Sequence, residues 1–586
     1  MDFGIWFLVA TALVFFMQCG FMMLEAGFTR AKNAGNIIMK NIMDFSMGTI
    51  AFLLIGFTLL TAEDYLFGLI GVPNLGIFTD FSNFNFSDFV FNLVFCATAA
   101  TIVAGAMAER TKFGAYIIYS IVLCAVVYPI QAGWVWNESG WLAQMGYVDF
   151  AGSSAIHMVG GLTAFIGAAI LGPRIGKYVV DKNTGKKIVN AIPGHSLTLG
   201  ALGTFILWLG WYGFNGAAAE NLPQLGAIFV TTTLAPAAGA TATMIFTWLK
   251  NGKPDVSMTL NGALAGLVGI TAGTSNVDAL GALIIGTVAG VLVVLAIEFI
   301  DMKLHVDDPV GAVAVHGVCG IWGTLAVGLF ARPILAFEET VKEVVSVVNN
   351  EVVVTEVTET IEHVISDVTG LFYGGGTELL GIQAIGLLAI MAWTTITMSV
   401  LFFLLKKAGF LRASAEDEII GLDSTEHGLI SSYADFLPVS NPDIEALNGA
   451  SISPDAAIPV KNVSTGKKLT KVSIITKASK FGNIRDALDS IGITGLTVTN
   501  VMGYGVQRGH THTYRGVPLA SPLHPKMQVD IVISKVPVDV LIKTIKGVLY
   551  TGNIGDGKIF VSDVENVVRI RTGEEGYDAL QDTVNK

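Results

Sequence analysis

Residues 149–161 read DFAGSSAIHMVGG, and residues 308–320 read DPVGAVAVHGVCG. In both stretches an aspartate is followed by a histidine eight residues later and by a glycine four residues beyond that histidine. Each histidine, His157 and His316, lies inside an apolar run of the kind that crosses a membrane as a helix. The same spacing in the fifth and the tenth apolar runs indicates that the chain is built from two related halves.

The apolar runs also indicate how many times the chain crosses the membrane. Hydrophobic residues make up 52% of the chain and charged residues only 14%, which is too apolar for a wholly soluble protein. A helix needs about twenty apolar residues to cross ~30 Å of hydrocarbon. Runs of this length occur at 5–28, 36–61, 87–108, 114–135, 149–172, 194–216, 225–248, 256–274, 279–300, 310–330 and 379–405. The sequence therefore predicts an α-helical polytopic membrane protein with eleven transmembrane helices.

Eleven helices divide into two halves of five and one additional helix. Halves with an odd number of spans lie upside down relative to each other, and such inverted repeats place a binding site between them near the midplane. We therefore expect a five-plus-five inverted repeat in which His157 and His316 meet near the axis that relates the halves.

Basic residues in the connections predict the orientation of the chain. They gather in alternate connections, among them Arg30, Lys32, Arg110, Lys112, Arg174, Lys177, Lys250, Lys303, Lys406 and Lys407. The positive-inside rule then places the N-terminus outside and everything after residue 406 in the cytoplasm, in a multi-pass protein of the cytoplasmic (inner) membrane. The net charge of −12 and the lack of a basic stripe exclude nucleic acid as a partner.

The two histidines have a functional and a structural interpretation. An ionisable side chain inside a membrane helix is costly and is by default a functional candidate. The alternative is a pair of buried neutral imidazoles that only hydrogen-bond to their neighbours. Equivalent positions in the two halves favour function, because a neutral imidazole pair can bind a small polar molecule without the cost of a buried charge. Trp136 has two interpretations as well: an interfacial belt residue, or a ring that holds a cation over its face.

Several motifs in the first 430 residues closely resemble the ammonium transporter (Amt/Mep/Rh) family. They are MLEAGFTRAKN at 23–33, GAMAERTKF at 105–113, DFAGSSAIHMVGG at 149–161, WYGFNGA at 211–217, VDDPVGAVAVHGVCGIWG at 306–323 and EDEIIGLDSTEHG at 416–428. The resemblance implies a homotrimer in which each protomer has its own narrow pore for ammonium or ammonia, with the lipid bilayer around it.

The resemblance also implies a substrate pathway, formed by Trp136, Phe95, Phe214, Asp149, His157, His316 and Ala218. In the family pattern Trp136 and Phe95 recruit the cation at the outer mouth, Phe95 stacks on Phe214 as a hydrophobic gate, and the two histidines line the pore. Asp149 is a buried carboxylate that supports recruitment. Ala218 stands where many members have a serine, so a hydrogen bond worth ~1 kcal/mol to the ion is missing there.

A small cation cannot cross such a pore with its charge, because burying a bare ammonium ion in a low-dielectric passage costs many kcal/mol. We therefore expect that ammonium gives up its proton near Asp149 or His157 and passes the histidines as ammonia.

Beyond the tenth run, residues 334–369 form an insertion whose alternation predicts a short hairpin or an amphipathic helix. We divide the chain into a transporter domain (1–410), its cytoplasmic C-terminal region (411–433), a linker rich in proline and small residues (434–468) and a regulatory domain (469–586).

Residues 469–586 have the composition of a soluble domain. Strand-like runs (KVSIIT, LTVTNVMGYGV, QVDIVIS, KIFVSDV) alternate with helical ones (KFGNIRDALDSI, VDVLIKTIKGVLY) in the order βαββαβ, which is typical of an α+β ferredoxin-like fold. The glycine-rich turn at 552–558, followed by Arg569 and Arg571, offers amides and cations to a polyphosphate, although a tight hairpin is the simpler interpretation.

This segment strongly resembles the PII signalling proteins, through GLTVTNVMGYGVQRGH, YTGNIGDGKIFV and VVRIRTGEEG. The resemblance implies a trimer that binds ATP or ADP and senses 2-oxoglutarate through Mg-ATP. By position, the nucleotide contacts are Thr497, Gly505, Gln507, Lys526, Gly555, Gly557, Lys558, Arg569 and Arg571. Gln507 also helps to hold Mg and 2-oxoglutarate, and Arg515 at the tip of the T-loop is the residue that enters a pore exit.

The sequence thus favours a regulated ammonium transporter that is not an enzyme. Two trimers of matched symmetry present three T-loops to three pores, and tethering raises the local concentration into the millimolar range. We therefore expect the fused domain to block the pores with its T-loops. The alternative is an ammonium sensor that transports little and signals through the fused domain.

Overall fold

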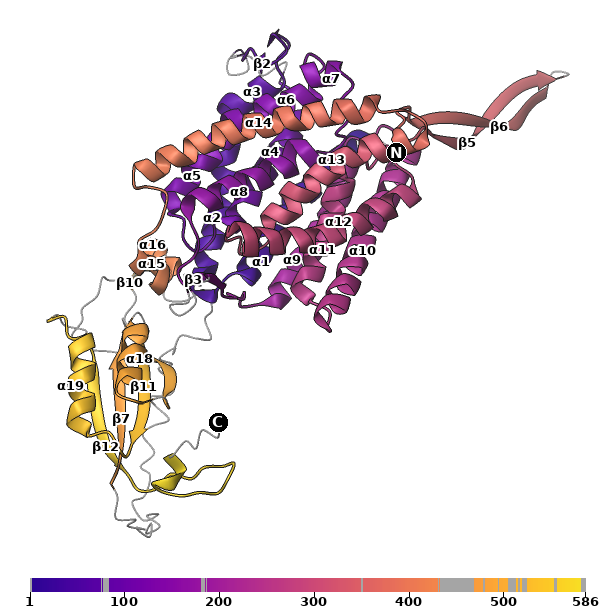
Figure 1. Ribbon diagram of the computed structural model, residues 1–586. Helices are drawn as coiled ribbons and strands as arrows, with labels where there is room; N and C mark the ends of the chain where they lie inside the picture. Colours follow the sequence, from indigo (N-terminus) through magenta and orange to yellow (C-terminus); the bar gives the residue numbers. More distant parts are fainter. Residues whose placement is uncertain are drawn as a thin grey trace. The chain divides into compact units, whose positions relative to one another are not determined.

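The computed structural model describes most of the chain, in two units. The described residues are 3–74, 76, 84–180, 185, 187–348, 351–429, 432, 468–477, 480–493, 495–503, 513–514, 517–518, 524–552 and 556–580. The units are Met1–His427, which is almost entirely helical, and Gly428–Lys586, which contains a β-sheet (Figure 1).

The first unit is a bundle of membrane-spanning helices. In order, the spans are α1 (Phe3–Phe28), α2 (Ala34–Ala51) continued by η2 (Phe52–Gly56) and α3 (Phe57–Leu60), α4 (Phe86–Ala106), α5 (Phe113–Val122) continued by η5 (Leu123–Val127) and α6 (Tyr128–Trp136), η6 (Ser153–Met158) with α8 (Val159–Leu171), α9 (Leu197–Gly216), α10 (Leu222–Asn251), α11 (Val256–Thr271), α12 (Ala279–Phe299), η8 (Val313–Val318) with α13 (Cys319–Phe330), and α14 (Glu378–Lys407). Among the described residues, ten of these spans are long and apolar enough to cross a membrane, and the shorter α11 completes the set. The eleven predicted helices are confirmed.

The fifth and tenth spans begin with the same local structure. Each starts as a π-helix, η6 or η8, preceded by an aspartate whose carboxylate accepts hydrogen bonds from the first backbone N–H groups of the turn. The donors are Gly152, Ser153, Ser154 and Ala155 for Asp149, and Val310, Gly311 and Val313 for Asp308. Gly152 (φ +106) and Gly311 (φ +86) make the sharp entry, since a left-handed backbone favours glycine. The repeated spacing in the sequence therefore corresponds to a repeated structure.

Glycines let these two spans touch at their backbones. A Cβ atom built on Gly161 would lie 2.0 Å from the backbone nitrogen of Gly317, and one on Gly320 would lie 2.5 Å from the carbonyl oxygen of Ser153. Close crossings of this kind require residues without side chains. The third residue of each repeated pattern, the glycine, is thus the point at which the halves meet.

The insertion between the tenth and eleventh spans is a hairpin. β5 (Ile334–Val348) and β6 (Glu351–Ser366) pair antiparallel, and the pairing closes at Val348 opposite Glu351. Of the two predicted alternatives, hairpin and amphipathic helix, the hairpin is correct. Figure 1 shows it extending beyond the bundle, next to the start of α14, the long helix that runs along the outside of the other spans.

The C-terminal region of this unit is fastened to the start of the second span. α15 (Ala415–Ile420) and α16 (Leu422–His427) follow α14. The Asp423 carboxylate accepts hydrogen bonds from the backbone N–H groups of Gly35 (3.0 Å) and Asn36 (2.7 Å). A carboxylate at a helix N-terminus satisfies free N–H groups and the helix dipole. The region is therefore part of the folded membrane unit.

The second unit is a four-stranded antiparallel sheet with two helices. The sheet and its helices are β7 (Leu469–Thr476), α18 (Phe481–Ser490), β8 (Thr497–Gly503), β11 (His524–Ile533), α19 (Val538–Leu549) and β12 (Lys558–Val564), so the predicted βαββαβ order is confirmed. A short separate pair, β9 (Thr513–Tyr514) and β10 (Val517–Pro518), lies between β8 and β11 in the chain. The strands lie in the order β12-β7-β11-β8. Alternate residues of β7 and β11 pack against α18 and α19, forming a core that includes Val472, Ile474, Ile484, Leu488, Val529, Ile531, Leu541 and Ile545.

Candidate functional site

The two histidines meet inside the bundle, as the repeat predicts. The Nδ1 atoms of His157 and His316 lie 3.2 Å apart, and the ring centroids are 5.2 Å apart with planes inclined by 25°. Both side chains are buried, His157 fully and His316 with 3% exposure. At this distance one Nδ1–H donates to the other Nδ1, so the two imidazoles hold complementary tautomers.

Aromatic rings continue from His157 in a stack. His157 stacks on Trp211 (centroids 5.0 Å apart) and on Phe214 (5.3 Å). Phe214 then meets Phe95 at 4.4 Å with the planes inclined by 40°. The indole N–H of Trp211 donates to Thr271 Oγ1 at 2.9 Å, which fixes the ring. The structure brings together the predicted Phe95 and Phe214, and it adds Trp211, which lies in a recognised motif but received no role from the sequence.

Trp136 and Asp149 lie together at the start of the fifth span. The Trp136 indole N–H donates to the backbone oxygen of Asp149 at 2.8 Å. The Asp149 carboxylate accepts four backbone N–H groups and the Ser154 hydroxyl (2.6 Å). A carboxylate has about four lone-pair sites, so these bonds occupy it and make it an organising group for the turn. Ala218 lies beyond α9 and is exposed.

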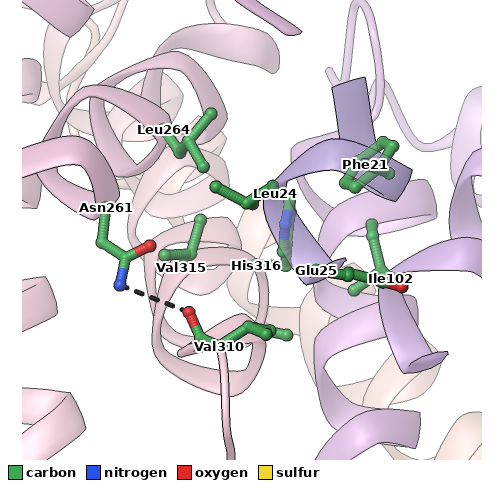
Figure 2. A pocket seen from close by; sticks show the side chains of 10 residues that line it. Phe21, Leu24, Glu25, Ile102, Asn261, Leu264, Val310, Val315 and His316 are labelled. Carbon is green, nitrogen blue, oxygen red and sulfur yellow. Dashed lines mark hydrogen bonds between the residues drawn. The ribbon is translucent and has the colours of Figure 1, made fainter. Parts of the chain in front are cut away.

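Each histidine also has a free side. The Nε2 atom of His157 is buried and has no hydrogen-bond partner among the described residues. On the other side of the pair, His316 lines a small cavity with room for about one water-sized molecule, together with Phe21, Leu24, Glu25, Ile102, Asn261, Leu264, Val310, Ala312 and Val315 (Figure 2). Rings, imidazoles and cavity thus follow one another through the bundle.

A cluster of buried ions lies at the ends of the third, fifth and ninth spans. Arg174 donates to both carboxylate oxygens of Asp307 (2.8 and 2.9 Å) and to Glu109 (3.0 Å), and Arg30 also pairs with Glu109. Burial disfavours the charge on Asp307, but the hydrogen bonds of Arg174 and the charge of Arg110 outweigh it and lower the pKa of Asp307 to about 2. From the sequence, Arg30, Arg110 and Arg174 are predicted only as basic residues of the connections, because their pairing depends on contacts between distant segments.

In the second unit, two predicted lysines lie at the same end of the sheet. Lys558 on β12 is opposite Ile475 of β7, and Ile475 is opposite Gln528 on β11, two residues from Lys526. Thr497 lies at the start of β8, several residues further along.

The glycine turn and the arginines flank β12. Gly557 has φ +119, and a Cβ there would lie 2.2 Å from the Ile475 carbonyl oxygen, so only glycine fits. Arg569 donates to Glu574 at 2.8 Å, whereas Arg571 is exposed. The remaining predicted contacts, Gly505, Gln507, Gly555 and the T-loop residue Arg515, lie outside the described residues.

Relatives of the membrane unit are ammonium transporters. Ammonium transporter Amt2 of Archaeoglobus fulgidus is 42% identical over 448 residues, covering 74% of this chain and 88% of that protein. Ammonium transporter 1 member 3 of Solanum lycopersicum is 35% identical over 452 residues, covering 72% of this chain and 92% of that protein.

Solved structures share the fold. One described as "Sensor Amt Protein" matches with a TM-score of 0.62 and 33% identity, covering 72% of this chain and 97% of that one. Mep2 of Candida albicans matches with a TM-score of 0.59 and 27% identity, covering 75% of this chain and 92% of that one.

Two protein families match the chain in succession. Residues 5–431 match the Ammonium Transporter Family, and residues 469–574 match Nitrogen regulatory protein P-II. Since the first match takes in every membrane span and the second takes in the whole four-stranded sheet, the chain belongs to the ammonium transporter family and carries a P-II domain at its C-terminus.

Proposed function

We propose that the membrane domain conducts ammonium by passing ammonia along the His157–His316 pair, and that the P-II domain regulates this flow. The observation that carries the proposal is the buried Nε2 atom of His157, which has no partner among the described residues and lies next to the aromatic stack. It offers a polar contact to a small nitrogen compound in an otherwise apolar passage.

The aromatic stack supports deprotonation before entry. Phe95 and Phe214 close the approach to His157 with apolar rings, and a hydrated cation would lose its water there at a cost of several kcal/mol. Ammonia loses far less. Because the Asp149 carboxylate is occupied by hydrogen bonds, we assign to it the organisation of the turn, and to His157 the binding of ammonia once the proton has been lost.

Recruitment takes place beside Trp136. Its ring lies at the start of the fifth span, and a cation over an indole face gains ~0.5–2 kcal/mol. Ala218 contributes no hydroxyl to this site. With the predicted orientation, this mouth and the N-terminus face outward, and the C-terminal region and P-II domain are cytoplasmic.

The P-II domain supplies the regulatory half of the proposal. Lys526 and Lys558 share one end of the sheet, next to Gly557, where ATP or ADP phosphates would be held, with Mg and 2-oxoglutarate bound through Gln507. Apolar side chains on the sheet, such as Phe560 (51% exposed), favour a homotrimer that buries them. Such a trimer presents Arg515 of each T-loop to one pore. The domain bounds that we propose are 1–410, 411–433, 434–468 and 469–586.

An ammonium sensor is the second candidate. The match to the structure described as "Sensor Amt Protein" and the missing hydroxyl at Ala218 favour it. In that case the membrane domain binds ammonium and changes the P-II domain without sustained transport.

Currents from proteoliposomes containing the full chain test both candidates. Ammonium pulses should evoke currents, and ATP, ADP or 2-oxoglutarate added on the P-II side should change their amplitude. Tight ammonium binding without current would favour the sensor. If ammonium evoked currents that ATP, ADP and 2-oxoglutarate did not change, transport would be supported and the regulatory role of the P-II domain would be wrong.

A further inference from the structure

The cavity beyond His316 contains a buried carboxylate that the transport pathway described above does not use. Glu25, on α1, is 3% exposed and lines the cavity together with His316 (Figure 2). Its Oε2 atom accepts a hydrogen bond from Asn41 Nδ2 at 2.9 Å. A carboxylate in the hydrocarbon region of a membrane protein is costly unless it serves a partner or a substrate.

No cation of the described chain pairs with Glu25. Among the described residues, none of the Lys, Arg or His side chains lies within salt-bridge distance of its carboxylate. Lys40, one position before Asn41 in the chain, donates instead to the backbone oxygen of Thr111 at 2.9 Å. Within the described part of the chain, the Glu25 carboxylate therefore has no cation in direct contact, and the charge of Lys40 acts on it only from a distance.

A second acceptor lines the same cavity. Asn261, on α11, is 5% exposed, and its Nδ2 donates to the Val310 carbonyl, drawn as a dashed line in Figure 2. That bond fixes which atom of the amide is oxygen, and the Asn261 Oδ1 atom is buried without a partner among the described residues. Leaving a buried acceptor unpaired costs about 1–3 kcal/mol. Carboxylate, amide oxygen and imidazole together make a lining rich in acceptors.

The repeat gives this cavity a matching place on the other side of the histidines. Trp136 and the proposed recruitment site lie at the start of η6, where Asp149 organises the turn. The cavity lies at the start of η8, where Asp308 organises the turn and Val310 lines the wall. The relation between the repeats thus pairs the turn beside the proposed recruitment site with the turn beside the cavity.

We propose that the cavity between His316 and Glu25 binds ammonium as a cation. Its N–H groups would donate to the Glu25 carboxylate, beside the bond from Asn41, and to Asn261 Oδ1, which has no partner among the described residues. Glu25 is then a specificity-determining residue of the pore, which holds a cation site on each side of the imidazole pair. The inference rests on the proposed passage of ammonium through this pore.

The test uses the full chain with Glu25→Gln and, as matched control, Asp44→Asn. Asp44 is also buried in α2 and bonds to Thr101, but it does not line the cavity. Infrared difference spectra of purified protein, recorded with ammonium chloride against sodium chloride, should contain a carboxylate signal that E25Q abolishes and D44N retains. In proteoliposomes, E25Q should raise the ammonium concentration for half-maximal current roughly 10- to 100-fold, the loss expected for a hydrogen bond to a charged group.

A second variant keeps the proposal testable if E25Q does not fold. Asn261→Leu preserves the size of the side chain and removes the other acceptor. It should therefore also raise the ammonium concentration needed for half-maximal current. If both variants gave the same spectra and currents as wild type, the proposed cation site would be wrong, and the proposed transport would be unaffected. An ammonium signal that depends on Glu25 in a protein without currents would keep the site and overturn transport.

Discussion

His157 and His316, 159 positions apart in the chain, share a hydrogen bond between their Nδ1 atoms at 3.2 Å. The bond joins π-helical turns from the two halves and commits one proton to the space between the rings. Each ring then presents its Nε2 atom away from the pair, so the arrangement can bind a polar molecule on either side without carrying a charge.

Removing either imidazole should abolish the hydrogen-bonded pair. We expect His157→Ala to lower ammonium-evoked currents in proteoliposomes about two- to tenfold, because a hydrogen bond of about 0.5–1.5 kcal/mol to ammonia is lost. His305→Asn, at a histidine outside the pair, is the control and should conduct as wild type. Equal currents in both variants would contradict a role for the pair in conduction.

Removing a ring from the aromatic stack should lower the selectivity of the pore for ammonium over potassium. Phe214 contacts Phe95, Trp211 and His157, and it is 1% exposed. Phe214→Ala should destabilise the unit by about 3–5 kcal/mol and let potassium evoke a current that wild type excludes, since the apolar barrier to hydrated ions is opened. Phe372→Ala, at an exposed ring, should change neither property. A folded Phe214→Ala protein that still excludes potassium would show that the barrier lies elsewhere.

The Asp307–Arg174 pair predicts how the membrane domain responds to acid. The pKa of Asp307, about 2 in the folded protein, lies below the ~3.9 of an unfolded aspartate, so its stabilisation is complete above pH ~4 and is lost as the pH falls toward 2. Asp307→Asn should remove about 3–5 kcal/mol at neutral pH, because Arg174 is left buried and partly unpaired.

Thermal unfolding in detergent between pH 7 and pH 3 measures this effect. The difference in unfolding free energy between wild type and Asp307→Asn should stay constant down to pH ~4 and shrink below it. A constant difference across the whole range would mean that the pKa of Asp307 is the same in the folded and the unfolded protein.

Two glycines offer a matched pair of substitutions. Gly161→Ala would place a Cβ 2.0 Å from the Gly317 nitrogen and should cost about 1–3 kcal/mol or more in unfolding free energy. Gly226→Ala, in α10 with nothing within 4 Å, should stabilise by up to about 1 kcal/mol through helix propensity. Thermal unfolding of both variants provides the comparison, and equal shifts would disprove the close crossing.

In the P-II domain, the exposed Arg571 should contribute to nucleotide affinity. Arg571→Ala should weaken ATP binding by the full chain about tenfold or more, because a hydrogen bond from a charged donor to phosphate is lost. Lys543→Ala, on the exposed side of α19, is the control for a simple loss of charge. Calorimetric titration with ATP and ADP measures both variants, and unchanged affinity in Arg571→Ala would place the phosphate elsewhere.

Much of the fold follows from local sequence patterns. Apolar length predicts the spans, and the spacing of Asp149, His157 and Gly161 against their counterparts predicts the repeat. The alternation of apolar and polar residues predicts the strands of the P-II domain. For the insertion at 334–369 it predicts either a hairpin or an amphipathic helix. These features depend on neighbours within about twenty residues.

The details of the site depend instead on contacts between distant segments. The stacking of Trp211 on His157, the occupation of the Asp149 carboxylate by five donors and the cavity position of Glu25 all require the tertiary structure. In the sequence, Glu25 lies within a recognised motif near the end of the first predicted span, and the structure places it on the last turns of α1. Only the contact of Phe21 with His316 and the cavity lining that Glu25 shares with His316 show that it faces the pore.

The backbone contact of Gly161 with Gly317 has a consequence for the speed of turnover. Carriers that rock one half against the other need a sliding surface, and two main chains in direct contact leave no deformable layer between them. The pore between the fifth and tenth spans should therefore keep its width throughout a transport cycle. Local movements of the gate rings would then time each passage, in place of domain motions that take microseconds to milliseconds.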